Sequence, residues 1–134
     1  MKFKEIVQLA KDVKAYTEKH RKLPDKMDGL TKPEYAYILV RSVLNPNKEI
    51  NKLSYPYGPN PHGDTILKVL TKNEYLAICK EVNKFINEHK RFPNYDQYQD
   101  VKVSMGLLTY CNTKIIDFYN KNGRLPATCK FDSS

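Results

Sequence analysis

Internal repetition is the feature that most constrains the fold of this 134-residue chain. The hexapeptide LTKPEY at residues 30–35 recurs forty positions later as LTKNEY at residues 70–75. A second motif, a cation followed by a large apolar residue and proline, occurs three times and ends at Pro24, Pro93 and Pro126. Repetition over such intervals is typical of chains in which similar units pack side by side and share one core.

The apolar residues upstream of the three prolines match as well. Eleven residues before each proline stand Val13, Val82 and Ile115, and eight residues before it stand Tyr16, Phe85 and Phe118. These positions fall on stripes spaced by three and four residues, as one face of a helix requires. We therefore expect Tyr16, Phe85 and Phe118, together with Tyr75, to lie in the core.

Helix boundaries are marked by local signals. Thr31 and Glu34 have the spacing of a capping box, and so do Thr71 and Glu74. Gly123 follows an apolar stripe, where a residue that tolerates the left-handed conformation ends a helix. Each unit therefore reads as a capped helix, a stop, a basic turn with proline, and a link to the next helix.

These signals predict a mainly α protein that forms a single domain over residues 1–134. About three tandem helical units, at roughly residues 3–44, 64–103 and 104–134, would share one core. Residues 45–63 are rich in Pro, Asn and Tyr and read as an irregular insertion or a degenerate unit. Ile50 and residues 53–55 are the candidates for a short strand pair within it.

Charge and composition restrict the function. The net charge of +8 favours anionic partners, and no apolar run approaches the roughly 18 residues that a membrane span needs. The cysteines, Cys79, Cys111 and Cys129, are too widely spaced for a zinc motif, and Cys79 and Cys111 fall on apolar helical faces. No phosphate loop or metal-ligand histidine pair is present in the sequence. We expect no catalytic residue, no metal and no cofactor in this chain.

Two segments resemble the pseudomurein-binding repeat, in which an aromatic-containing helix precedes a turn similar to Asn-Gly-Arg-Leu-Pro. They are FYNKNGRLP at residues 118–126 and FINEHKRFPNY at residues 85–95, and the helix opening KNEYL at residues 72–76 is similar too. The resemblance covers most of the chain outside residues 45–63. It implies noncatalytic binding of pseudomurein, the peptidoglycan-like wall polymer of some methanogenic archaea.

The family occurs in adhesin-like surface proteins and in pseudomurein endoisopeptidases, the lytic enzymes of archaeal viruses. No segment resembles the catalytic domain of these enzymes, and the N-terminus reads as a charged amphipathic segment rather than a signal peptide. We therefore expect a targeting domain that is made in the cytoplasm, released by lysis and active at the archaeal wall, where it places an attached endoisopeptidase.

We expect pseudomurein to be the partner, rather than nucleic acid or membrane; the oligomeric state is open. Two alternatives remain: a basic helical nucleic-acid-binding protein and a helical-repeat module that binds other proteins. Binding to duplex DNA with a steep salt dependence would favour the first, and peptide binding without wall binding would favour the second.

Nine residues are candidates for ligand contact. Lys22, Arg91 and Arg124 stand two places before their prolines and would supply positive charge at equivalent sites; the alternative is that they only complement the negative ends of helices. Asn94, Tyr95 and Tyr98 follow the middle proline. Tyr55, Tyr57 and Asn60, with the neighbouring His62, lie in the proline-rich segment, which is either a binding loop or a surface excursion.

Overall fold

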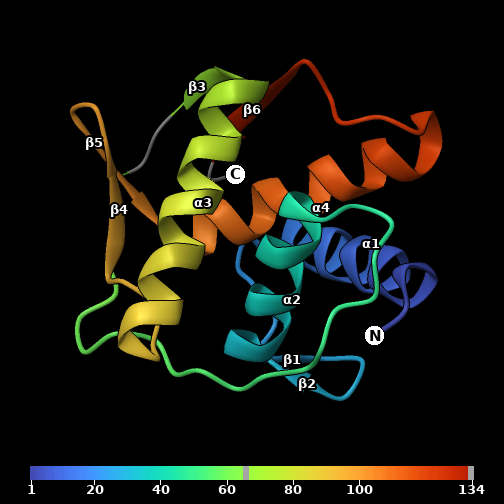
Figure 1. Cartoon of the computed structure of the whole chain (residues 1–134), viewed down its shortest axis with the longest axis horizontal. Helices are drawn as coiled ribbons and strands as arrows, with labels where there is room; N and C mark the ends of the chain where they lie inside the picture. The colour runs from blue at the N-terminus through green and yellow to red at the C-terminus, as the bar shows by residue number, and fades with distance from the viewer. Residues whose placement is uncertain (65–66, 133–134) are drawn as a thin grey trace.

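The computed structural model describes residues 1–64 and 67–132. This part of the chain contains four helices and six short strands (Figure 1). The helices are α1 (Phe3–His20), α2 (Lys32–Leu44), α3 (Lys72–His89) and α4 (Met105–Asn122). The strands are β1 (Lys26–Met27), β2 (Leu30–Thr31), β3 (Leu67–Thr71), β4 (Tyr95–Tyr98), β5 (Val101–Ser104) and β6 (Thr128–Asp132).

The prediction of a mainly α protein is wrong, because the described strands pair into three two-stranded antiparallel sheets and the fold is mixed α and β. Each sheet lies between the end of one helix and the start of another. Strands of two to five residues are too short for a two-residue periodicity to stand out in the sequence. The one strong local signal was Asp28-Gly29, a turn pair typical of hairpins, which connects β1 and β2.

Local helix signals, by contrast, are confirmed. The Thr31 side chain accepts a hydrogen bond from Glu34 N at 3.4 Å, and the Glu34 carboxylate accepts one from Thr31 N at 2.9 Å. The same reciprocal pair joins Thr71 and Glu74 at 3.3 and 3.0 Å. Gly123 ends α4 with φ of 71°, in the left-handed region where glycine carries no steric penalty.

Helix α4 lies at the centre of the molecule, where it packs against α1 and α2, while α2 also packs against α3 (Figure 1). Apolar side chains from all four helices and from the strands form one core. Tyr75 is fully buried there, as predicted. The prediction of a core position is wrong for Tyr16, Phe85 and Phe118, which are only half-buried at the helix surfaces. All three cysteines are buried, as the apolar faces of Cys79 and Cys111 predicted for those two.

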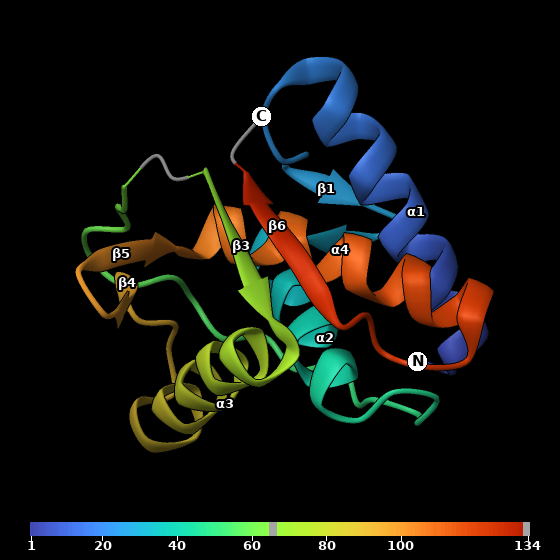
Figure 2. The ribbon, with the colours of Figure 1, turned by 90° about the horizontal axis from the view of Figure 1, so that it is seen from above.

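The pair β3–β6 joins segments that are far apart in the chain. Its register runs from Leu67 opposite Asp132 to Thr71 opposite Thr128, so the last strand lies beside the strand that leads into α3 (Figure 2). This pairing closes a ring in which α3, the hairpin β4–β5, α4 and the pair β6–β3 follow one another. In the second half of the chain, the strand that follows the last helix, α4, therefore pairs with the strand that precedes the first helix, α3.

Residues 45–64, which we call the connecting segment, contain no strand, so the predicted strand at Ile50 and residues 53–55 is wrong. Ile50 instead donates its N–H to Met1 O at 2.9 Å and accepts a hydrogen bond from the Met1 amino group. Prolines at positions 56, 59 and 61 lack the N–H that a strand ladder needs. The segment runs past α2 and reaches the hairpin β4–β5 (Figure 1). Within the described residues, no helix is both long and apolar enough to cross a bilayer.

Candidate binding site

The three repeated prolines close turns of the same geometry, which we call the proline turns (residues 21–24, 90–93 and 123–126). The residue that caps the preceding helix stands three places ahead of each proline: these caps are Arg21, Lys90 and Gly123, with φ of 60°, 58° and 71°. Each of these residues donates its N–H to the carbonyl four residues earlier at 2.8 Å. The basic-apolar-Pro motif is therefore the sequence of one specific helix ending.

The strands that follow the turns share one register. The residue two places after each proline pairs with the N-cap of a helix, in the pairs Lys26 with Thr31, Tyr95 with Ser104, and Thr128 with Thr71. The third pair belongs to β3–β6, so the long-range sheet reproduces the geometry of the two local hairpins. Every proline turn is thus fixed against the start of a capped helix.

A buried tyrosine hydroxyl fastens two of the turns. Tyr35 donates to Pro24 O at 2.5 Å, and Tyr75 donates to Pro126 O at 2.6 Å. Both tyrosines come from the repeated hexapeptide and stand four residues after the N-cap. Leu108 holds this position in α4 and has no hydroxyl to donate.

Arginines stack on the aromatic residues in two of the turns. The Arg91 guanidinium carbon lies 5.1 Å from the Phe85 ring centre, and that of Arg124 lies 5.2 Å from the Phe118 ring centre. Cation–π contact of this kind holds the planar guanidinium over a half-buried ring. In the first turn, the Tyr16 ring lies against the His20 ring with 4.2 Å between centres, and Phe85 makes the equivalent contact with His89 at the same distance.

The three candidate cations, Lys22, Arg91 and Arg124, differ in their exposure to solvent and in their contacts within the protein. Arg124 and Lys22 are exposed, whereas Arg91 is half-buried and donates from Nη1 to Phe92 O at 3.0 Å. All three follow the C-terminal end of a helix, where positive charge is favourable whether or not a ligand is present. Arg124 and Lys22 are therefore the candidates best placed to contact a large ligand.

The connecting segment packs against the middle proline turn. Asn60 N donates to Asn94 Oδ1 at 3.0 Å, and Phe92 N donates to Pro56 O at 2.9 Å. Gly58 makes this approach possible, because a Cβ at that position would collide with Asn94 Oδ1. The structure thus brings Asn60 and Asn94 together, as partners of each other.

The candidate tyrosines are also engaged within the protein. The Tyr98 hydroxyl donates to Glu74 Oε2 at 2.6 Å, and the Tyr95 ring contacts the His62 ring at 4.8 Å between centres. Tyr55 packs edge-on against Tyr37. Of this group only Tyr95 and Tyr98 lie in the same strand, β4, with Tyr95 directly after Asn94.

Tyr57 occupies a different environment. Its ring packs against Phe92 at 5.3 Å between centres, and its buried hydroxyl has no hydrogen-bond partner in the described part of the chain. Burial raises the pKa of this phenol, so the hydroxyl stays protonated and able to donate.

Tyr57 and Lys22 line a pocket of about 360 Å³ where the first proline turn, the connecting segment and the start of α4 meet. We call this the inter-unit pocket, because it lies between the first proline turn and the helix that follows the middle one. Its lining also includes Arg21 and Lys32, which are not among the nine residues predicted for ligand contact. The basic character of residues 19–22 could have pointed to Arg21, and the repeated hexapeptide, in which Lys32 matches Lys72, could have pointed to Lys32.

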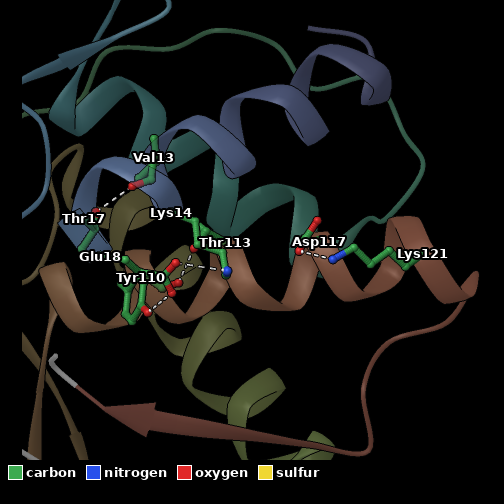
Figure 3. Close-up of polar contacts among 8 residues, drawn as sticks. All are labelled: Val13, Lys14, Thr17, Glu18, Tyr110, Thr113, Asp117 and Lys121. Carbon is green, nitrogen blue, oxygen red and sulfur yellow. Dashed lines mark hydrogen bonds and ion pairs between the residues drawn. The ribbon is translucent and has the colours of Figure 1, made fainter.

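The side of the inter-unit pocket formed by α1 and α4 is held by polar contacts (Figure 3). The Tyr110 hydroxyl donates to Glu18 Oε2 at 2.7 Å, and Thr17 donates to Val13 O at 2.7 Å. The hydrogen bond from Tyr110 lowers the pKa of Glu18, whose other oxygen pairs with Lys14 at 3.3 Å. This carboxylate is therefore ionised, and its two oxygens are already engaged by Tyr110 and Lys14.

A second, more open pocket lies at the third proline turn. Its lining includes Arg124 and Leu125 from the turn, and Thr71, Lys72 and Asn73 from the start of α3. Lys22, Leu23 and Lys32 hold the corresponding positions in the inter-unit pocket. Two of the three proline turns thus combine a cation, an apolar residue and a helix start around a hollow.

The described residues contain no group of three or more side chains that could hold a metal ion. Burial raises the pKa of the Cys79 thiol to about 12, which leaves it protonated and unreactive.

Residues 66–95 match the family model of the pseudomurein-binding repeat. The match spans β3, α3, the middle proline turn and the first residue of β4, and it confirms the resemblance over this segment. The family indicates a noncatalytic role in binding a cell wall. No curated protein matches the chain.

Proposed function

We propose that this chain binds pseudomurein without catalysis and holds an attached pseudomurein endoisopeptidase against the archaeal wall. The observation that carries the proposal is the match of residues 66–95 to the pseudomurein-binding repeat. The other two proline turns, with the same helix ending and strand register, support an extension of the role beyond that segment. The attached enzyme and its viral origin rest on the family resemblance.

The proline turns suit a polymer of amino sugars cross-linked by short peptides. A guanidinium pairs with a peptide carboxylate through two parallel hydrogen bonds, and sugar rings pack their apolar faces on aromatic side chains. Arg124 and Phe118 offer both groups at one exposed turn, and Arg91 and Phe85 repeat the arrangement. Lys22 offers charge at the first turn. Weak contacts at several turns would add up to strong retention on a repetitive polymer.

The remaining candidates have a supporting role in this proposal. Asn60 and Asn94 fix the connecting segment beside the middle turn, and Tyr95 and Tyr98 present half-buried rings on β4. Tyr55 and Tyr57 pack against other aromatic rings and would act through the shape of the segment.

The test is a pull-down with purified pseudomurein, with bacterial murein as the control polymer and with salt varied in both. We expect retention on pseudomurein and not on murein. Arg124→Gln should weaken retention by about tenfold, because a charge-assisted hydrogen bond to a carboxylate contributes about 1.5–3 kcal/mol. Lys84→Gln, which removes one positive charge from an exposed site on α3 away from the turns, is the matched control and should change little.

Equal retention on both polymers, lost in parallel as salt rises, would leave only generic charge attraction. Tight binding to duplex DNA without wall binding would replace the proposal with the nucleic-acid alternative. To test targeting, the chain is fused to an endoisopeptidase catalytic domain. The fusion should speed digestion of intact wall but not of a soluble peptide substrate, and equal rates on intact wall with and without the chain would reject targeting.

A further inference from the structure

We propose that the inter-unit pocket binds a carboxylate carried on a short apolar stem, as in an acylated amino acid or the C-terminal residue of a peptide. The assignment rests on the shape of the pocket, its charges and one unpartnered hydroxyl. It does not rest on the proposed wall-binding function, although Lys22 belongs to both, because a small acid in solution is enough to test it.

The pocket has room and an apolar wall for the stem. Its volume of about 360 Å³ is within the range of small-molecule sites, and Leu23, Tyr57 and Leu107 supply apolar surface. Gly106 leaves space at the start of α4, since a Cβ there would meet only Leu23 Cδ1, at 3.7 Å. A short aliphatic side chain would be desolvated against these groups.

The charges around the pocket favour an anion. Arg21, Lys22 and Lys32 line it together with His62, and its lining contains no Asp or Glu. Lys32 has an exposed partner in Asp25 at 3.6 Å, but Arg21 and Lys22 form no ion pair within the described residues. Two cations thus remain available to a ligand at the mouth of an apolar hollow.

Polar groups within the pocket suit a carboxylate. Tyr57 lines the pocket, and its hydroxyl is buried without a partner in the described chain; such a group costs free energy unless a ligand or water accepts a hydrogen bond from it. The pocket also includes the first turn of the 18-residue helix α4, whose positive end adds to the attraction. The apolar wall beside these donors favours a carboxylate with an apolar stem over inorganic anions, because inorganic anions have no stem to bury.

The experiment is a titration of the full chain with N-acetyl-leucine, followed by the amide signals of Gly106, Leu107 and His62 in two-dimensional NMR. N-acetyl-leucinamide lacks the charge and acetate lacks the stem, so each isolates one half of the proposed ligand. We expect saturable shifts with a Kd of roughly 1 mM for the acid, as the low efficiency of small ligands allows. The amide and acetate should bind at least about tenfold more weakly.

Two variants place the site. Gly106→Leu fills the hollow with a good helix former and should abolish binding with the helix intact. Lys22→Glu reverses an exposed charge and should weaken the acid at least about tenfold while leaving the amide unchanged. Lys84→Glu makes the same change at an exposed site on α3 that lines neither pocket and is the matched control, which should bind as the unaltered chain does.

Equal affinity for acid and amide would overturn the proposal, and so would undiminished binding by Gly106→Leu. Shifts confined to residues 71–73 and 124–127 would place the ligand in the second pocket and also overturn it. If the chain binds the wall but not N-acetyl-leucine, the pocket proposal alone is refuted. If it binds the acid but not the wall, the proposed function alone is refuted.

Discussion

The hairpin β1–β2 and the strand pair β3–β6 make the same connection between a proline turn and a capped helix, one locally and the other across the chain. Directly beside β1–β2, Lys32 N donates to Asp25 O at 3.1 Å, and directly beside β3–β6, Lys72 N donates to Ala127 O at 2.9 Å. The tyrosine–proline bonds span 11 residues in one case and 51 in the other. The repeated unit is therefore defined by its register in space and not by continuity along the chain.

The long-range connection costs more entropy. Closing a 51-residue loop instead of an 11-residue one costs about 1.4 kcal/mol more by the logarithmic dependence on length. The longer strands offset this cost, since β3 and β6 have five residues each, whereas β1 and β2 have two. In addition, β6 buries Phe131 completely in the core.

The largest loss of stability should come from removing the packing of β6 that offsets the entropic cost of the long loop. Phe131→Ala is expected to reduce the free energy of unfolding by about 3–5 kcal/mol, because it removes a fully buried aromatic side chain and leaves a cavity. The comparison is Met27→Ala in β1, where the side chain is half-buried and the loss should be smaller. Urea unfolding of both variants measures the difference. Equal losses would show that β6 contributes no more than its local counterpart.

The pH dependence should differ between the local and the long-range sheets. In β4, burial and the neighbouring Glu81 carboxylate raise the pKa of Asp96 to about 7. The residue that corresponds to Glu81 beside β6 is Lys114, which donates to Lys130 O and adds no carboxylate. Since the folded state holds the Asp96 proton more tightly than the unfolded state, stability falls as pH rises from 5 to about 7.

The expected loss between pH 5 and pH 8 is roughly 2–3 kcal/mol, at about 1.4 kcal/mol for each pKa unit within that range. Thermal unfolding of the unaltered chain and of Asp96→Asn measures it, and the variant should show a much flatter dependence. Lys114→Gln serves as the control and should leave the slope unchanged. A slope that persists in Asp96→Asn would assign the effect to other groups.

The tyrosine–proline bonds allow a direct test of equivalence. Tyr35→Phe and Tyr75→Phe each leave a buried proline carbonyl without its donor and should each cost about 1–2 kcal/mol. Tyr98→Phe removes a hydroxyl bonded to the partly exposed Glu74 and should cost less. Denaturant midpoints at constant slope give the three values. A loss confined to Tyr35→Phe would contradict the equivalence of the two connections.

The smallest effect is expected at the helix caps. Thr31→Ala and Thr71→Ala should each cost about 1 kcal/mol, because one capping bond to the backbone is lost. Hydrogen exchange separates their consequences. Thr71→Ala should increase exchange in β6 through its pairing with Thr128, whereas Thr31→Ala should act only on β1 and α2. Unchanged exchange at Thr128 in the Thr71 variant would show that the cap and the sheet are independent.

The features that the sequence predicted correctly are those set by a few adjacent residues. The caps at Thr31 and Thr71, the stop at Gly123 and the burial of Tyr75 all follow from local spacing and periodicity. The β3–β6 pair could not be predicted in this way, because its register depends on where α3 and α4 come to rest. The short hairpins were missed because two to five residues carry little periodicity.

The aromatic residues eight places before the prolines show a second limit. Phe85 and Phe118 have the spacing of core residues, but each sits at the edge of the core under an arginine from its own turn. Helical spacing identifies a shared face and does not tell how far that face is covered. Likewise, the candidate cations were found from the repeat, whereas the inter-unit pocket also needs Lys32 and Gly106, which only the packing of separate units brings together.

The ring closed by β3 and β6 has a consequence for the order in which this protein is made. As the chain leaves the ribosome, β1 and β2 meet after a few residues, but β3 has no partner until residues 128–132 emerge. During that interval it is an open strand edge, of the kind that recruits other nascent chains. Lys68 on this strand is a charged side chain of the type that discourages such association. The edge of β3 is covered once residues 128–132 pair with it.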